Sequence, residues 1–328
     1  MDLILNTFGS CLTKDNEAFM AINKDGARQR VLPDDVRSII ISRGAQISSD
    51  AVLLAIEHEI EVLFVDKGGH PQGRIWSNKY GSISTIRKGQ LLFVRSKEAV
   101  KWIIDIIENK IENQQALLWT FTATYPETSK IVERTVGRLE KYRLKVKELQ
   151  GEQISDIAAQ LRGWEGLVSK HYFEQMNNFL PERYRFSERS QHPAMDVVNA
   201  MLNYGYGMLY GKIEGSLIRA GVDPYIGVLH RDEYNRPVLI YDVIERYRVW
   251  VDYVVFTLVG KHIVGEEYYS IKPDGSCWLE GLGRRIVIQS MNDYLGEVIS
   301  LKGMERSRMT HIDLFCQNLA QQFKGINV

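Results

Sequence analysis

The chain has 328 residues, with 41 lysine and arginine side chains against 41 aspartate and glutamate side chains, 45% hydrophobic residues and 25% charged residues. This length predicts one large domain or two ordinary ones, and the apolar content excludes a disordered chain. The formal net charge of zero provides no general attraction for polyanions. Any nucleic acid would therefore have to bind a local basic patch.

The cysteine content and the hydropathy pattern predict a cytoplasmic protein. Cys11, Cys277 and Cys316 are far apart and lack Cys-x-x-Cys spacing, which argues against a disulfide framework or a thiolate zinc site. No stretch approaches the roughly 20 apolar residues that a bilayer span needs, and the first residues lack the features of a signal peptide. We therefore expect no membrane association.

Short apolar runs separated by turn residues fill the first 86 residues. Asp25-Gly26 and Lys67-Gly68-Gly69 tolerate the positive φ of chain reversals. Ser48 and Ser49 predict the start of one short helix, with its buried face formed by Val52, Leu53 and Ile56. The runs themselves predict strands at 3–5, 18–22, 38–41 and 61–65. Residues 1–86 should thus form a mainly-β, sandwich-like domain with one short helix.

The period of the apolar residues becomes helical after a predicted linker at 87–95. The first helical stripe contains Val100, Ile103, Ile104, Ile107 and Ile111. Later segments continue this pattern at 194–220, 238–259, 283–299 and 304–323. We therefore predict an α+β multidomain protein, in which an all-α domain over 96–328 follows the β domain.

The basic residues are unevenly placed. Residues 1–90 contain 11 basic and 11 acidic side chains, whereas one predicted helix is rich in bases: Lys130, Arg134, Arg138, Lys141, Arg143, Lys145 and Lys147. Smaller clusters lie at 183–189 and 284–285. A solvated helix face with i,i+4 ion pairs would explain any one cluster. Several clusters in one domain make a nucleic-acid surface more plausible.

Titratable side chains have unusual sequence neighbours at three places. Glu165 stands between two glycines, which allow a ligand or the backbone to approach closely. His230 ends a mostly apolar loop after a predicted helix. Asp242 and Glu245 are three residues apart, so a helix would place both carboxylates on one face. The repulsion between them favours a nearby cation.

These residues fit two kinds of site. One imidazole with two or three carboxylates is a suitable donor set for Mg²⁺ or Mn²⁺. Alternatively, Glu165 could cap a helix, His230 could be a core histidine, and the two later acids could pair with Arg246 and Arg248. Residue spacing slightly favours these structural roles, because no compact metal motif is present. Phosphate-binding glycine loops and the serine-hydrolase elbow are also absent from the sequence.

These three places and residues 199–206 carry a family resemblance. Four segments carry it: Glu165-Gly166 with Tyr172-Phe173, residues 199–206, residues 220–230, and residues 241–245 with Arg248 and Asp252. In order and spacing they closely resemble the CRISPR-associated protein one family, the integrase (also called endonuclease) of CRISPR spacer acquisition. The long stretch that ends at His230 is the most specific of them.

The resemblance implies an N-terminal β domain that forms a homodimer and a C-terminal α-helical catalytic domain. By position, Glu165, His230 and Glu245 would be the catalytic ligands of Mg²⁺ or Mn²⁺. Asp242 would be an adjacent acid that assists through water. Balanced total charge can coexist with a DNA surface, for which the candidates are Arg138, Lys141, Lys145 and Arg248.

The resemblance also implies partners and a reaction. Two integrase dimers would flank one small dimeric CRISPR-associated partner. The complex would hold a short protospacer DNA duplex and join its 3′-hydroxyl ends to the CRISPR repeat by transesterification. The alternatives are a metal-dependent phosphodiesterase acting on branched or single-stranded nucleic acid and a catalytically silent DNA-binding scaffold.

Overall fold

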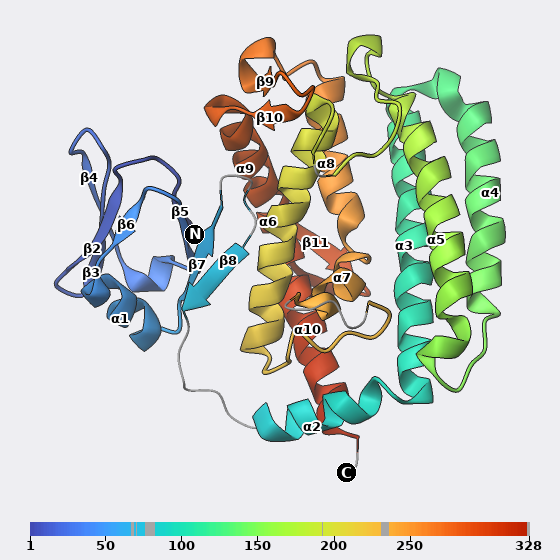
Figure 1. Cartoon of the computed structure of the whole chain (residues 1–328), viewed down its shortest axis with the longest axis horizontal. Coiled ribbons are helices and arrows are strands. Elements are labelled where there is room, and N and C mark those ends of the chain that lie inside the picture. The colour runs from blue at the N-terminus through green and yellow to red at the C-terminus, as the bar shows by residue number, and fades with distance from the viewer. Residues whose placement is uncertain (67–68, 70, 76–82, 192, 231–235, 327–328) are drawn as a thin grey trace. The chain divides into compact units, whose positions relative to one another are not determined.

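The computed structural model describes residues 1–66, 69, 71–75, 83–191, 193–230 and 236–326. It divides the chain into two compact units, Met1–Gly81 and Ser82–Val328 (Figure 1). The first unit is rich in strands and the second is mostly helical, which confirms the predicted fold class. Lys67 and Gly68 of one predicted turn lie outside the described residues, whereas Gly26 and Gly69 adopt positive φ as expected.

Two four-stranded sheets form the first unit. One has the order β1-β5-β7-β8, in which β1, β5 and β7 are parallel and β8 is antiparallel. The other has the order β4-β3-β2-β6 and is antiparallel except between β2 and β6. The strands are β1 (Asp2–Leu5), β2 (Cys11–Asp15), β3 (Ala18–Ile22), β4 (Arg28–Val31), β5 (Ser38–Ser42), β6 (Gln46–Ile47), β7 (Glu61–Val65) and β8 (Pro71–Ile75).

One hydrophobic core joins both sheets to helix α1 (Ser49–Glu57). The side chain of Ser48 caps α1 by accepting a hydrogen bond from the Ala51 amide, as its position predicts. The predicted buried face of α1 is wrong, because Leu53 is 55% exposed while Ala51, Leu54 and Ala55 are fully buried. Alanine has no bulk beyond Cβ, so this face allows α1 to approach the sheet closely.

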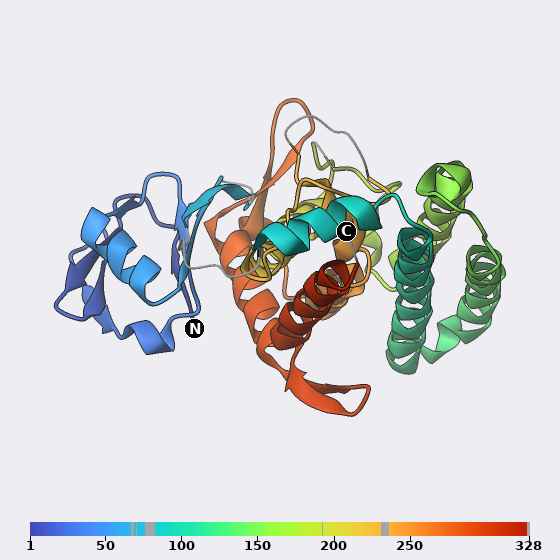
Figure 2. The same ribbon diagram turned by 90° about the horizontal axis from the view of Figure 1, so that it is seen from below.

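The second unit contains the long helices. They are α2 (Ile83–Phe93), α3 (Lys97–Thr124), α4 (Ser129–Lys147), α5 (Ile154–Asn177), α6 (Val197–Arg219), α7 (Val238–Ile244), α8 (Arg248–Gly260), α9 (Gly281–Gly296) and α10 (Arg308–Lys324). Figures 1 and 2 show α3, α4 and α5 side by side, and α6 against α8 and α10. A single core cluster runs through all of these helices, whereas α1 packs in the separate core of the first unit.

Short elements complete both units. They are the 3₁₀ turns η1 (Pro33–Asp35), η2 (Pro126–Thr128), η3 (Glu182–Tyr184) and η4 (Glu266–Tyr268), and the strands β9 (Tyr269–Ile271), β10 (Cys277–Leu279), β11 (Val298–Leu301) and β12 (Met304–Ser307). β9 pairs with β10 and β11 with β12, both antiparallel. No helix among the described residues is both long and apolar enough to cross a membrane.

The segment expected to be a linker at 87–95 is mostly helical. Its helix α2 buries Ile86 and Phe93 in the core of the second unit. A side chain at Gly89 would place its Cβ 1.8 Å from the carbonyl oxygen of Phe323, so glycine permits the close contact between α2 and α10. The boundary between the units therefore lies near residue 81, and α2 belongs to the helical unit.

Three other predicted helical segments are interrupted or shortened. The segment 238–259 is divided into α7 and α8, with Glu245 as the residue that caps the end of α7. The last residues of the segment 283–299 and the first residues of the segment 304–323 belong to the hairpin β11–β12. The apolar residues of that hairpin, such as Val298 and Met304, are exposed. The helical period therefore wrongly predicts that they lie on a buried helix face.

Candidate functional site

Helix α5 carries Glu165 on its inner face. Leu161, Val168 and Tyr172 are fully buried, and Glu165 has the same helical spacing, so it lies on the same face as a half-buried residue. A central position in the helix excludes the alternative in which Glu165 is a helix cap. A Cβ added at Gly163 or at Gly166 would meet no atom within 4 Å, so both neighbouring glycines border open space.

A buried lysine of α3 contacts Glu165. Lys110 is 3% exposed, and its Nζ donates a hydrogen bond to Glu165 Oε1 and forms an ion pair with Glu245 Oε2. Burial of an ammonium group is costly unless it is paired, and here two carboxylates supply the pairing. Burial lowers the pKa of Lys110, but the charges of Glu245 and Glu165 outweigh this effect, so its pKa is raised and it stays protonated.

Glu245 is held by two cations. Arg248 Nε donates to Glu245 Oε1 at 2.7 Å, while Lys110 lies at Oε2. Burial raises the pKa of Glu245, but Arg248 and Lys110 together lower it to about 2, so the carboxylate stays ionised. Oε2 is buried and accepts no directed hydrogen bond among the described residues. The pairing with Arg248 is one of the expected alternatives, whereas Arg246 is paired with Asp105.

Asp242 fixes the loop that carries His230. Its fully buried carboxylate accepts hydrogen bonds from the backbone amides of Val228, Leu229 and His230, at 2.7 to 3.1 Å. The same carboxylate lies 2.7 Å from His230 Nδ1. An ionised carboxylate only accepts hydrogen bonds, so Nδ1 must carry the proton and Nε2 is left for a ligand. Asp242 is thus a support for the imidazole.

The charge of His230 depends on opposing effects. Burial lowers its pKa, whereas the hydrogen bond and charge of Asp242, together with the charge of Glu245, raise it; the net direction is upward. Arg162, one turn before Glu165 on α5, donates to the carbonyl of Leu229 at 2.6 Å. These interactions connect the His230 loop electrostatically with Glu245 and structurally with α5.

The predicted ligands are brought into one region but are not gathered around a common point. Lys110 joins Glu165 to Glu245, and Asp242 holds His230. Within the described part of the chain, no three His, Cys, Asp or Glu side chains are placed to hold a metal ion. Two carboxylates and one imidazole are nevertheless chemically suited to Mg²⁺ or Mn²⁺. The ligand set stays a prediction.

The predicted DNA contacts divide into two groups. Arg138, Lys141 and Lys145 are exposed at i, i+3 and i+7 of α4, which places them on one face. Lys145 Nζ lies 5.8 Å from the ring centre of Trp164, the residue before Glu165. In contrast, Arg248 is engaged inside the protein, bonded to Glu245 and stacked over another side chain.

Lys110 is the residue that motif spacing misses. It has a sequence signal, because it occupies a buried position in the apolar stripe of α3 with Ile103, Ile107, Gln114 and Leu117. A charged residue within such a stripe needs a buried partner. The stripe alone does not identify that partner, since Glu165 and Glu245 lie on other helices.

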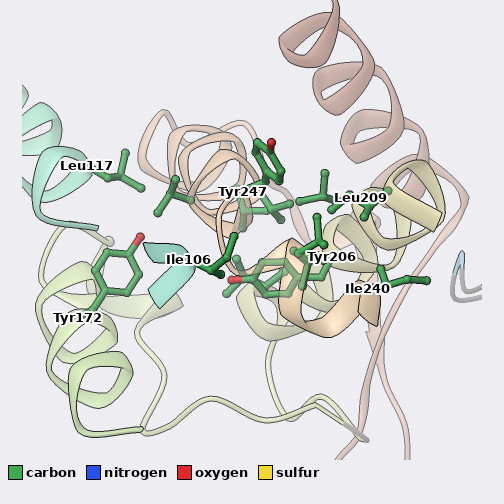
Figure 3. Packing of buried hydrophobic residues seen from close by; sticks show 14 of the residues in the cluster. Ile106, Leu117, Tyr172, Tyr206, Leu209, Ile240 and Tyr247 are labelled. Carbon is green, nitrogen blue, oxygen red and sulfur yellow. The ribbon is translucent and has the colours of Figure 1, made fainter. Parts of the chain in front are cut away.

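A second buried carboxylate lies close by, in the core. Asp252 accepts hydrogen bonds from the hydroxyls of Tyr172, at 2.9 Å, and of Tyr206. Figure 3 shows both tyrosine rings among the packed side chains, together with Ile106. Burial raises the pKa of Asp252 to about 6, although the two hydroxyls and nearby arginines oppose the shift. Tyr206 is therefore a core residue.

Comparison with known proteins confirms the family resemblance. The family model described as CRISPR associated protein Cas1 matches residues 3–293. A CRISPR-associated endonuclease Cas1 from Archaeoglobus fulgidus is 30% identical over 99% of this chain and 97% of its own length. Another from Thermus thermophilus is 41% identical over 37% of each chain.

Solved structures share the fold over almost the whole chain. A casposase bound to its integration product has a TM-score of 0.84 at 22% identity, covering 98% of this chain and 90% of its own. A Cas1 protein from Thermotoga maritima has a TM-score of 0.80 at 17% identity, covering 100% and 98%. A Cas6-RT-Cas1–Cas2 complex has a TM-score of 0.80 at 22% identity, covering 98% of this chain and 35% of that one.

Proposed function

The chain belongs to the CRISPR-associated Cas1 family, and from this premise we propose that it is a metal-dependent DNA integrase. It would join the 3′-hydroxyl ends of a short protospacer duplex to the CRISPR repeat. The observation that carries the proposal is the pair of carboxylates, Glu165 and Glu245, held around one cation in the region of an oriented His230. The similar fold of a casposase bound to an integration product also supports it.

The reaction is a transesterification at phosphorus. The 3′-oxygen of the protospacer forms a new bond to a repeat phosphate, and the bond to the departing 3′-oxygen of the repeat breaks, so the number of phosphodiester bonds is conserved. A bound Mg²⁺ or Mn²⁺ would stabilise the charge on the phosphoryl oxygens and lower the pKa of the attacking hydroxyl. Because DNA supplies the nucleophile, the protein needs no nucleophilic side chain of its own.

The residues of the chain have separate tasks in this reaction. Glu165, Glu245 and the Nε2 atom of His230 would hold the ion. Asp242 orients the imidazole through its hydrogen bond with Nδ1 of His230, and it fixes the loop through three backbone amides. Arg248 fixes Glu245 through Oε1, so it does not compete for Oε2, where Lys110 lies.

Strand transfer tests this assignment. His230→Ala and Glu245→Ala should each reduce Mn²⁺-dependent joining of a labelled short duplex to repeat DNA by at least about 100-fold, since each removes a ligand of the ion that stabilises the transition state. The far-ultraviolet circular dichroism of both variants should match that of the unmodified protein. Undiminished joining would contradict the assignment. Cleaved repeat without joined product would instead indicate a phosphodiesterase.

The exposed basic face of α4 is the proposed DNA path to the site. Its last member, Lys145, lies against Trp164 and so beside the helix turn that carries Glu165. Phosphate contacts release counterions, which makes affinity fall steeply with salt. Changing Arg138, Lys141 and Lys145 together to glutamine should therefore weaken binding of duplex DNA and reduce the slope of log affinity against log salt by about 3.

A matched control changes a basic side chain that is already paired with acidic side chains. Arg143 lies on the same helix but binds Glu140 and two glutamates of α3, so Arg143→Gln should leave the salt slope unchanged. A triple variant with unaltered DNA affinity would show that the path lies elsewhere.

Partner and assembly belong to the same proposal. The similarity to the Cas1 part of a Cas6-RT-Cas1–Cas2 complex supports a Cas2 partner. We expect a homodimer formed through the strand-rich unit, with two such dimers on each partner dimer. Together, several chains would give the short basic face of α4 the length that a DNA duplex requires.

A further inference from the structure

Lys110 occupies the place that a divalent ion would need. Its Nζ lies on one oxygen of Glu165 and one oxygen of Glu245. With Arg248 included, these four side chains carry two positive and two negative charges, so their sum is zero. A divalent ion added to this neutral set would be opposed by two cations at short range and would gain little net attraction.

The ion and the ammonium group also compete for the same atoms. A divalent metal binds carboxylate oxygen at about 2.1 Å, whereas an ammonium nitrogen lies about 2.8 Å from its acceptor. Both cannot stand between one oxygen of Glu165 and one of Glu245. Arg248 is not a competitor of this kind, because it binds the opposite oxygen of Glu245.

The contact of Lys110 is suited to release. Nζ pairs with Glu245 Oε2 and donates a hydrogen bond to Glu165 Oε1, so both contacts depend on one ammonium group. The lysine side chain has a flexible four-carbon stem, so Nζ can move while the backbone of α3 stays in place. Residues on either side of Lys110 in the stripe, Ile107 and Ile111, are fully buried and hold that backbone.

Building on the proposed function, we propose that Lys110 is the resident cation of the metal-free site. It is a positioning residue that keeps Glu165 and Glu245 together until a divalent ion arrives and then withdraws its Nζ from between them. This role explains why the chain places a lysine in the buried stripe of its longest helix. It also explains why the predicted ligands are in one region without forming a preassembled metal site among the described residues.

Calorimetric titration with Mn²⁺ tests the role of Lys110. Lys110→Met removes the competing charge and nearly preserves the volume, so it should bind Mn²⁺ more tightly, by on the order of tenfold. Without metal, the two carboxylates would face each other uncompensated, so this variant should melt at a lower temperature and recover more stability on adding Mn²⁺. Lys97→Met is the control, because Lys97 lies on the same helix and pairs with Glu152, but on the surface.

The outcomes separate this inference from the proposed function. If the unmodified protein binds Mn²⁺ and His230→Ala does not, but Lys110→Met binds it equally or more weakly, the inference is overturned and the proposed site stands. If the unmodified protein binds no Mn²⁺, the proposed metal site fails and the inference with it.

Lysine labelling provides a second measurement that needs no variant. Saturation with Mn²⁺ should make Lys110 of the unmodified protein react faster with an acetylating reagent, as read by peptide mass spectrometry, while the labelling rate of Lys97 stays constant. An unchanged labelling rate of Lys110 would show that Nζ does not move, and would overturn the inference.

Discussion

Glu245 and Asp252 are both buried and lie seven residues apart, yet their pKa values move in opposite directions. Burial acts on both carboxyl groups by raising the pKa, but Arg248 and Lys110 reverse the effect at Glu245. Asp252 receives its closest hydrogen bonds from two neutral tyrosine hydroxyls, and its pKa is raised to about 6. The difference teaches that the charge of the partner, more than depth in the core, decides which acid stays ionised.

This contrast separates a ligand from a structural group. An ionised carboxylate that is paired with a lysine, such as Glu245, can exchange that protein cation for a metal ion. Asp252 has both oxygens bonded by core side chains, Tyr172 and Tyr206, and so connects α5, α6 and α8. Both acids belong to segments of the family resemblance, and only their surroundings distinguish them.

The largest effect that tests this contrast is a pH dependence of stability. The folded state binds a proton on Asp252 more tightly than the unfolded state, so this group favours folding below about pH 4, and its contribution is lost as the pH rises through about 6. This difference in the pKa of Asp252 between the folded and unfolded states corresponds to roughly 3 kcal/mol of unfolding free energy. Glu245 has the opposite sign, because its contribution is lost as the pH falls from about 4.5 to about 2.

Urea unfolding between pH 4 and pH 7 measures the Asp252 contribution. Asp252→Asn should flatten the decline in unfolding free energy over this range, whereas Glu245→Gln should leave the decline in place. An identical slope in the Asp252→Asn variant would show that the carboxyl group titrates at the same pH in both states.

A smaller effect on stability is expected from the Tyr172 hydroxyl, which donates a hydrogen bond to Asp252. Tyr172→Phe deletes a hydrogen bond to a buried carboxylate without creating a large cavity, and should lower the unfolding free energy at pH 7 by about 1–3 kcal/mol. The midpoint of urea unfolding measures this loss. Phe173→Leu offers a comparison at the adjacent, half-buried position that leaves Asp252 untouched. An unaltered midpoint for Tyr172→Phe would contradict a supporting role of the hydroxyl.

Local sequence patterns predict most of the fold for a physical reason. Strands such as β5 and β7 are continuous Ile- and Val-rich runs, and the amphipathic period of α3 to α5 repeats over several turns. The same patterns fail where packing decides. The linker at 87–95 is helical because Gly89 allows α2 to lie against the backbone of α10. The inner face of α1 contains two alanines beside Leu54, and apolar periodicity gives alanine too little weight.

The candidate site could be predicted only in part. Family segments single out Glu165, His230 and Glu245, and the three-residue spacing correctly suggests that a cation lies beside the later acid. That this cation includes Lys110 depends on how α3 packs against α5 and α7, which no local pattern contains. The support of His230 by Asp242 likewise depends on a loop that folds back onto α7.

The central claim is that one divalent ion binds between Glu165, His230 and Glu245 after Lys110 withdraws. Anomalous diffraction from crystals grown with Mn²⁺ tests it most directly. We expect a manganese peak about 2.2 Å from both carboxylates and from Nε2 of His230, with Nζ of Lys110 displaced from Glu245. A peak bound by other residues, or Lys110 still seated between the two carboxylates at saturating Mn²⁺, would contradict it.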